Sequence, residues 1–277
     1  MQFAPSTYYA AKIRQPSNRA KHDEVLKPLV QKVHEENYSV YGAEKVWEEL
    51  LRQDVPVARC TVERLMKDLG LEGARRGKAF VVTTKPDLVA ERPKDFVARN
   101  FNVLGPNRLW VADITYVRTL AGWVYVAFVI DVFSRMIVGW KVSTSLETGL
   151  CFDALEMALH SRSDHQGVIH HSDRGVQYLS IKYSDRLGEV GAVASVGSKG
   201  DSYDNALAES FNGLYKWELI YRKDKWQDVD DVEWATLCYV DWFNNHRLHG
   251  ANGMVPPIEL ENAYYRVIHQ EEILVSQ

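Results

Sequence analysis

Three acidic residues give the strongest chemical signal in this sequence of 277 residues. Asp113 lies inside the apolar segment LWVADITYV, Asp173 lies in HHSDRG, and Glu209 lies in GDSYDNALAESFNGLYK, with 35 residues between it and Asp173. An acid inside an apolar strand is costly unless it is paired or binds metal. Mg²⁺ prefers carboxylate oxygens and keeps several waters, so few protein ligands suffice. The three acids therefore suggest a two-metal phosphoryl-transfer site, in which one ion activates the attacking oxygen and the other stabilises the leaving oxygen.

Basic and amide side chains near Glu209 could hold phosphate. On a helix expected at about 204–220, Asn205, Glu209, Asn212 and Lys216 share one face because they recur about every 3.6 residues. Lys216 could grip a phosphate from this face. The preceding tract SVGSKGDSYDN is either a flexible loop or a loop that grips substrate, with Lys199 directed at phosphate.

Other residues compete for these roles. Asp131, in VIDVFSR, is the strongest rival for the first acidic position, and we interpret it as an acid at the end of a strand. His170 and His171 could bind zinc, but no cysteine pair lies nearby, so we prefer a buried strand histidine and one that lines the site. The three cysteines are widely separated and form neither a disulfide framework nor a paired-cysteine zinc site.

The elements that must position the acids begin with three closely connected segments rich in Val, Ile, Tyr and Trp. Their composition and short turns predict an antiparallel meander. After it we expect a helix, a buried strand that runs into Asp173, a second helix, another strand, and the helix that carries Glu209. The expected strands are 109–117, 122–131, 136–143, 167–172 and 190–197, and the expected helices are 147–162, 179–188 and 204–220. This order is typical of the ribonuclease H-like α/β fold, a mixed five-stranded sheet with flanking helices.

The N-terminal part of the chain has helical rather than strand periodicity. Apolar residues at helical spacing predict helices at 21–37, 41–53 and 57–71, with Pro28 as a kink or a late start. The second and third helices, joined by a short turn, resemble a helix-turn-helix. Arg59 and Arg64 near the start of the third favour contact with DNA. A small helical bundle for protein contacts is the alternative.

A basic segment punctuated by proline follows these helices. Arg75, Arg76 and Lys78 cluster beside glycines at its start. The segment is either a linker that follows DNA phosphates or a solvated connection. We therefore expect four parts: a helix-turn-helix-like DNA-binding region at 1–72, a linker at 73–106, the catalytic core at 107–225 and a C-terminal helical extension at 226–277. The segment WFNNHRLHGANGMVPPIEL predicts a helix, a turn and a stretch stopped by proline.

Polar residues in that C-terminal segment leave two interpretations open. Asn244, Asn245, His246, Arg247 and His249 could touch DNA or pack against the core.

Composition limits the class of protein. The longest apolar run, WVYVAFVI, is far shorter than the roughly 20 residues of a membrane-spanning helix. The N-terminus lacks the pattern of a secretory signal, so we expect a cytoplasmic protein. The net charge is −4, but residues 1–100 carry 18 Lys/Arg and 14 Asp/Glu, whereas residues 101–277 carry 15 and 23. Bound cations would offset part of this acidic excess, so the net charge does not exclude DNA.

At these motifs the chain resembles the OrfB-type transposases of bacterial insertion sequences, which are related to retroviral integrases. The resemblance runs in order through nearly the whole chain, in the segments YGAEKVWEELLR, LWVADITYV, GWVYVAFVIDVFSRMIVGW, HHSDRGVQY, GSKGDSYDNALAESFNGLYKWE and NNHRLHGANGMVPPIEL. It departs from the family where Leu248 stands in place of a frequent proline, and the stretch after it is looser than usual.

The resemblance implies a mechanism and partners. It implies that Asp113, Asp173 and Glu209 bind two Mg²⁺ ions, with Mn²⁺ as a substitute, and that Lys216 contacts DNA near the reacting phosphate. Family members cut transposon ends and join them to target DNA without a covalent protein intermediate. We expect a homo-oligomer on DNA, associated with the bacterial nucleoid. We also expect the chain to be fused with, or to bind, an upstream OrfA-type protein.

Three other functions compete with this one. A retroviral-type integrase should carry a His-His-Cys-Cys zinc module near its start, and the first hundred residues contain only Cys60. A non-catalytic DNA-binding regulator derived from a transposase should have lost part of the triad, yet all three acids are present. A structure-specific nuclease of the same fold would cut DNA without joining it.

Overall fold

The chain divides into two compact units in the computed structural model, Met1–Ala74 and Arg75–Gln277. The described residues are 9, 14–75, 103–173, 177–178, 180–196 and 206–275. No helix among them combines the length and apolar character that crossing a membrane requires. The finer division into four parts at 1–72, 73–106, 107–225 and 226–277 stays a prediction.

The first unit is a small bundle of three helices, as expected for a helix-turn-helix-like region. The helices are α2 (Asn18–Glu36), α3 (Ala43–Arg52) and α4 (Arg59–Asp68). Helix α2 begins three residues earlier than expected because the Ser17 side chain accepts a hydrogen bond from the backbone N–H of Ala20. Pro28 lies inside α2 and does not start it. The buried apolar residues of the bundle include Val30, Val33, Val46, Leu50, Val62 and Leu65.

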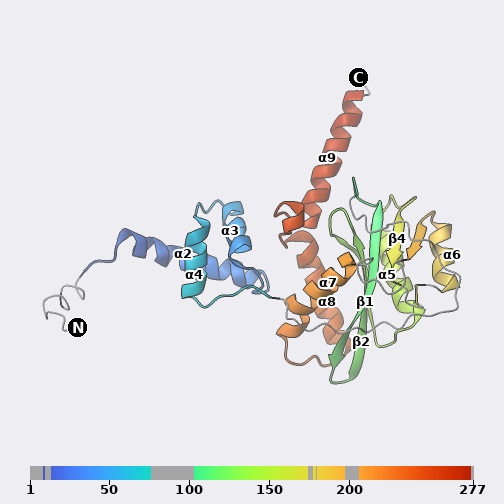
Figure 1. The fold of residues 1–277 in the computed structure, drawn as a ribbon, viewed down its shortest axis with the longest axis horizontal. Helices are drawn as coiled ribbons and strands as arrows, with labels where there is room; N and C mark the ends of the chain where they lie inside the picture. Colours follow the sequence, from blue (N-terminus) through green and yellow to red (C-terminus); the bar gives the residue numbers. More distant parts are fainter. Residues whose placement is uncertain are drawn as a thin grey trace. The chain divides into compact units, whose positions relative to one another are not determined.

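The second unit contains a five-stranded sheet with helices on both faces (Figure 1). The strands are β1 (Leu109–Thr119), β2 (Gly122–Asp131), β3 (Ile137–Ser143), β4 (Ile169–Ser172) and β5 (Val193–Val196). The helices are α5 (Thr148–Ser161), α6 (Ile181–Glu189), α7 (Ala206–Glu218), α8 (Val229–Asn245) and α9 (Pro257–Val275), with short 3-10 turns η2 (Ile220–Arg222) and η3 (Gly250–Asn252).

The strand order is β3-β2-β1-β4-β5. The pairs β1–β2 and β2–β3 are antiparallel, which confirms the predicted meander, whereas β4 and β5 join in parallel. Strand β5 begins later than expected at Val193, because α6 ends in a turn at Gly191, whose φ of 71° suits glycine. The ribonuclease H-like class predicted from the element order is confirmed.

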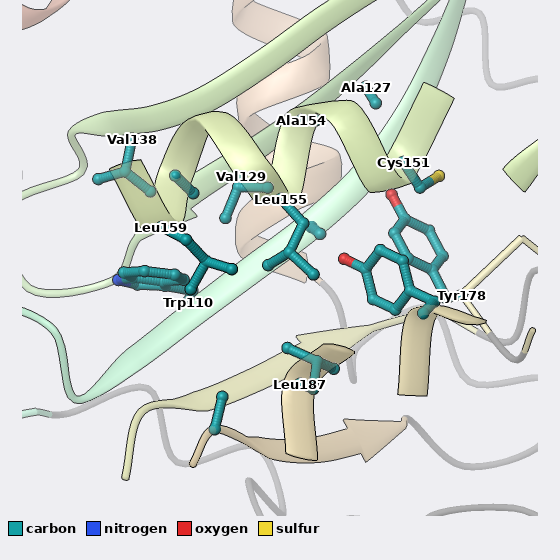
Figure 2. Close-up of a cluster of buried hydrophobic side chains, with 14 of the residues drawn as sticks. Trp110, Ala127, Val129, Val138, Cys151, Ala154, Leu155, Leu159, Tyr178 and Leu187 are labelled. Atoms are coloured by element: carbon teal, nitrogen blue, oxygen red, sulfur yellow. The ribbon is translucent and has the colours of Figure 1, made fainter. Parts of the chain in front are cut away.

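One face of the sheet packs against α5 and α6. Figure 2 shows Leu155 and Leu159 of α5 beside Trp110 of β1, with Leu187 of α6 in the same cluster. Close approach of α5 depends on Gly139 of β3, because a Cβ atom there would overlap the α5 backbone at Ala154. Cys151 lies buried in this cluster, and burial raises the pKa of its thiol to about 12, which suits an inert thiol.

The opposite face packs against α7 and α8. Phe128 of β2 contacts Phe211 and Tyr215 of α7 edge to face, with ring centroids 4.8 and 5.0 Å apart. Helix α9 follows and contacts α8. The predicted helix, turn and proline-stopped stretch correspond to α8, η3 and the residues up to Pro256, whereas the start of α9 at Pro257 was not predicted. Proline suits this position because its missing N–H would have no partner within the helix and its φ is already helical.

Candidate active site

Asp113 projects from β1 toward α7. Its neighbour across the antiparallel pair is Phe128, which packs on α7, and directly opposed residues point to the same face. One carboxylate oxygen of Asp113 accepts a hydrogen bond from the backbone N–H of Ile114 at 2.8 Å. The other accepts from the side-chain amide of Asn212 at 2.9 Å. Both oxygens of this half-buried carboxylate therefore have a defined orientation.

Asp173 follows the last residue of β4. Strand β4 runs parallel to β1, and the register places Ser172 opposite Ala112. The next residues along the two strand directions are Asp173, after β4, and Asp113, in β1. Parallel pairing therefore brings together two acids that are 60 positions apart in the sequence.

Glu209 lies in the first turn of α7, which packs against β1. Its side chain is exposed. Asn212 lies one turn further along the helix and Lys216 one turn beyond that, so the three share a face. The Lys216 ammonium lies over the ring of Tyr116, 4.2 Å from its centroid.

The acids influence one another's protonation. Burial and then the charge of Asp173 raise the pKa of Asp113 to about 8, and the charge of Glu209 adds to this shift. The pKa of Glu209 is raised by burial and by Asp173. Burial lowers the pKa of Lys216, and the negative charge of Asp113 opposes that change. The three carboxylates therefore repel one another in a shared region.

This donor set suits a hard divalent cation, which would remove the repulsion and keep the carboxylates ionised. The Asn212 side-chain oxygen is buried without a hydrogen-bond partner in the described part of the chain. Within that part, no three His, Cys, Asp or Glu side chains lie close enough together to bind one ion. The acids act on one another electrostatically without converging on a single point.

Asp131 has a different environment from the triad. It is fully buried at the end of β2 and accepts hydrogen bonds from the backbone N–H groups of Asn107 at 2.7 Å and Phe133 at 2.9 Å. These bonds fix the turn into β3. The structure therefore places Asp131 at a strand end, as the sequence suggested.

Both histidines of β4 are buried. His170 contacts the Tyr183 hydroxyl at 2.9 Å, and burial lowers its pKa to about 4, so it is neutral near pH 7. His171 contacts the Ser195 hydroxyl of β5 at 2.9 Å. Because His171 is fully buried between strands, it does not line an open site.

Helix α7 is held from behind by α8. The Tyr215 hydroxyl bonds to the Thr236 hydroxyl at 2.7 Å, and Phe211 packs edge to face on Phe243 at 5.1 Å. At the end of α7, Glu218 accepts hydrogen bonds from Arg247 at 2.5 and 2.8 Å. These contacts fix the rotation of the helix that carries Glu209.

The C-terminal polar residues mostly pack rather than project. Arg247 and His249 are buried, and the Asn244 amide bonds to both backbone groups of Ile137 in β3 at 2.9 Å. Only Asn245 and His246 of the set are exposed. The core-packing alternative therefore describes Asn244, Arg247 and His249.

The structure describes only some of the residues that were expected to contact DNA. Arg59 pairs with Glu44 at 3.1 Å and Glu63 at 3.0 Å on the surface of α4. Arg64 pairs with Asp23 at 2.7 Å, and Arg75 is exposed at the end of a described range. Outside the described residues lie Arg76, Lys78, Lys199 and Asn205. DNA contact by this set stays a prediction.

Two features were not assigned a site role from the sequence. The hydrogen bond from Asn212 to Asp113 could have been anticipated from the spacing of Asn212 and Glu209 on one helical face. The buried pair of Glu218 and Arg247 had no such signal, since 28 residues separate them and neither lies in an apolar pattern.

Comparisons with known families agree with this arrangement. Residues 104–202 and 191–257 match models described as integrase core domain, and residues 21–79 match an HTH-like domain. A chain of the simian T-cell lymphotropic virus intasome, solved with the PP2A regulatory subunit B56 gamma, superposes with a TM-score of 0.50. It is 14% identical, and the match covers 84% of this chain and 74% of that one, so it shows a shared fold.

Curated relatives are much more similar. The putative transposase for insertion sequence element IS986/IS6110 of Mycobacterium tuberculosis is 54% identical over 270 residues, which is 96% of this chain and 97% of the relative. The transposase for insertion sequence element IS629 of Shigella sonnei is 51% identical over 278 residues, covering 99% of this chain and 93% of the relative. Similarity at this level over nearly the whole length identifies the family.

Proposed function

This chain belongs to the OrfB-type insertion-sequence transposases of the retroviral integrase superfamily, and from that premise we propose that Asp113, Asp173 and Glu209 are its catalytic metal ligands. The chain is a DNA transposase with an integrase catalytic core and a helix-turn-helix-like region. Its family favours this function over a non-catalytic regulator. What the proposal adds is the assignment of individual residues.

The mutual effect of the three acids on protonation carries the proposal. Carboxylates that raise one another's pKa are stabilised in their ionised form when a cation occupies the space between them. Two Mg²⁺ ions bound there, or Mn²⁺ in their place, would activate the attacking oxygen and stabilise the leaving oxygen of a DNA phosphate. The acids hold the ions without becoming nucleophiles, so no Ser, Cys or Tyr nucleophile is required.

Other side chains of the site orient the reactants. The Asn212 amide and the Ile114 N–H fix the two oxygens of Asp113, so this ligand does not need to reorganise during the reaction. The Lys216 ammonium, on the same face of α7, would hold a phosphate of the substrate strand. Lys199 and Asn205, in the segment that leads into α7, would contact the same DNA.

The N-terminal part would provide further DNA contacts of its own. Arg59 and Arg64 of α4 would contact the transposon end, and Arg75, Arg76 and Lys78 would follow phosphates beyond it. Among the described residues, Arg59 forms ion pairs that are exposed, and such pairs contribute little and are readily exchanged for phosphate. A homo-oligomer on transposon-end and target DNA, an upstream OrfA-type partner, and a cytoplasmic location with nucleoid association complete the proposal.

Cleavage and joining of labelled element-end DNA test the assignment. In Mg²⁺, the wild-type chain, fused to its upstream partner where that partner is required, should cut and join ends. Glu209→Gln should reduce both steps by at least about a thousandfold, because it removes a ligand that acts on the transition state. Binding of the same DNA, measured in a chelator, should be unchanged.

The matched control is Glu233→Gln, which changes a half-exposed glutamate of α8 away from the acids. It should leave cleavage and joining within about twofold of wild type, an order-of-magnitude expectation for a surface substitution. Equal activity of wild type and Glu209→Gln would refute the triad. Cutting without joining by the wild type would instead favour a nuclease of the same fold.

A further inference from the structure

Aromatic and basic side chains gather on the second unit beside the acids. We call Tyr116, Trp123 and Tyr221, with Arg118 and Lys216, the aromatic patch. Trp123 lies edge to face on Tyr116 at 5.3 Å between ring centroids, and the Arg118 guanidinium lies over the Trp123 ring at 5.5 Å. Lys216 covers Tyr116 at 4.2 Å. The two rings in contact therefore lie between two cations.

Tyr221 of η2 joins the aromatic patch from the side of α7. It follows the end of α7, and Trp217 of that helix is the next residue after Lys216. The Tyr221 ring packs edge to face on Trp217 at 5.0 Å. The side chains of Tyr221 and Trp123 nevertheless remain 57% and 46% exposed, so much of each ring surface is open to a ligand.

The cations of the aromatic patch retain their charge for a partner. Neither Arg118 nor Lys216 forms an ion pair with any residue that the structure describes. Arg118 is exposed, and Lys216 is partly buried near the charge of Asp113. Cations that lie on aromatic rings can attract anionic ligands.

The aromatic patch is continuous with the acidic site. Lys216 links the two, because its ammonium covers Tyr116 and interacts with the charge of Asp113, although alternation along β1 directs Asp113 and Tyr116 to opposite faces of the strand. Strand β4 pairs with β1 only as far as Ala112. Past Ala112, β1 pairs with β2 and forms an isolated bridge from Thr119 to Trp226, so the patch lies on the β1–β2 hairpin beyond the end of β4.

We propose that the aromatic patch binds unpaired nucleobases of the DNA strand that leads into the acidic site. Aromatic rings bind single-stranded nucleic acid by stacking on base faces, while neighbouring cations hold the phosphates. Lys216 would hold the phosphate next to the acids, Trp123 and Tyr221 would stack on bases, and Arg118 would hold the strand further out. The proposal rests on the acidic site as the place where the strand reacts.

Two duplexes and a chelator test this surface without chemistry. The full chain is titrated into a fluorescein-labelled blunt duplex and into the same duplex with a short single-stranded thymidine extension, and anisotropy reports binding. Wild type should prefer the extended duplex. Trp123→Ala and Tyr221→Ala should each weaken binding of the extended duplex by about tenfold, and binding of the blunt duplex by less than about twofold.

Conservative and distant variants distinguish stacking from folding. Trp123→Phe and Tyr221→Phe keep a ring and should retain most of the preference. Trp234→Ala removes a tryptophan that is 69% exposed on α8, outside the patch, and should leave both affinities unchanged. Thermal unfolding by circular dichroism tests whether each variant is folded. If an Ala variant is unfolded, the Phe variant at the same position is used instead.

The proposal is overturned if wild type shows no preference for the extended duplex. It is also overturned if Trp234→Ala has the same effect as Trp123→Ala, or if Trp123→Ala weakens both duplexes equally. If the preference for the extended duplex is intact but Glu209→Gln cleaves DNA fully, the result would contradict the acidic triad and leave the aromatic patch in place.

Discussion

The two sides of α7 differ in how well their polar groups are paired. On the side toward α8, Phe211, Tyr215 and Glu218 are buried, and the polar atoms of Tyr215 and Glu218 are hydrogen-bonded. On the side toward the acids, Glu209 is exposed beside other carboxylates, and Asn212 has a buried oxygen without a described partner. The same thirteen-residue helix therefore carries one satisfied face and one unsatisfied face.

This difference separates stability from chemistry. The face toward α8 fixes where the helix lies, because packed rings and a buried ion pair tolerate little displacement. The acidic face keeps repulsion that only a ligand relieves, which costs stability and favours binding. Substitutions on the first face should therefore lower stability, and substitutions on the second should lower activity or even raise stability.

The largest loss of stability should come from breaking the buried pair at the end of α7. Arg247→Met leaves Glu218 buried without a charged partner and with the Tyr239 hydroxyl as its remaining hydrogen-bond donor among the described residues, and we expect the free energy of unfolding to fall by about 3–5 kcal/mol. Adding Glu218→Leu should recover most of that loss, because an apolar pair avoids desolvating two charges. Urea denaturation of the wild type, both single variants and the double variant measures the coupling.

Recovery would show that the pair is replaceable for stability. A double variant that stays as unstable as Arg247→Met would mean that Arg247 acts mainly through its other contacts, such as the Phe243 ring 5.3 Å away.

On the acidic face, Asp113→Asn should raise stability near pH 8 by on the order of 2 kcal/mol while abolishing cleavage. The pKa of Asp113 is about 8 in the folded chain, against an ordinary value of 3.8. Between these values the folded state binds more protons than the unfolded state, so stability falls as pH rises. In a chelator, wild-type stability should fall from about pH 4 to about pH 8, and the variant should show a flatter profile.

The pH profile of Glu233→Gln provides the comparison for that experiment, since this substitution lies away from the acids. A wild-type profile that rises with pH over the same window would contradict the repulsion among the acids. Adding Mg²⁺ should flatten the wild-type profile, because a bound cation keeps the carboxylates ionised.

A smaller effect is expected at Tyr215 on the packed face. Tyr215→Phe removes the hydroxyl that bonds to Thr236 at 2.7 Å and should cost about 1 kcal/mol. Tyr221→Phe removes a hydroxyl from an exposed ring and should change stability by less than about 0.5 kcal/mol. Thermal unfolding measures the loss of stability in both variants. Equal losses would show that burial of the Tyr215 hydroxyl does not determine its contribution to stability.

The elements that form the sheet and the surroundings of the acids were predictable from sequence. Composition rich in Val, Ile, Tyr and Trp and short turns identified the meander, and an acid inside LWVADITYV was conspicuous because charge is rare in such a strand. The motif resemblance then joined Asp113 to Asp173 and Glu209. Strand β4 supplies the physical link, since its parallel register with β1 is what places Asp173 beside Asp113.

Long-range polar pairs were beyond prediction from local pattern. Arg247 was assigned either to DNA or to the core, and only its burial against Glu218 decided between them. Proline was expected to stop a stretch of the C-terminal segment, which ends at Pro256, but the start of α9 at Pro257 was not predicted, because proline favours both the end of one segment and the first turn of the next. Such outcomes depend on tertiary contacts rather than on spacing.

The smallest change in stability is expected at Lys216, where the acidic face meets DNA. Lys216→Met keeps an apolar chain over the Tyr116 ring, so unfolding free energy should change by less than about 0.5 kcal/mol. DNA affinity should nevertheless fall, and the slope of log affinity against log salt should decrease by about one, as for a lost phosphate contact. Lys182→Met is the matched control, because Lys182 lies over the Phe152 ring at 4.1 Å on the opposite side of the sheet. If both variants change the salt slope equally, Lys216 makes no specific phosphate contact; if only Lys216→Met does, the acidic face of α7 binds DNA through a residue that the fold does not need.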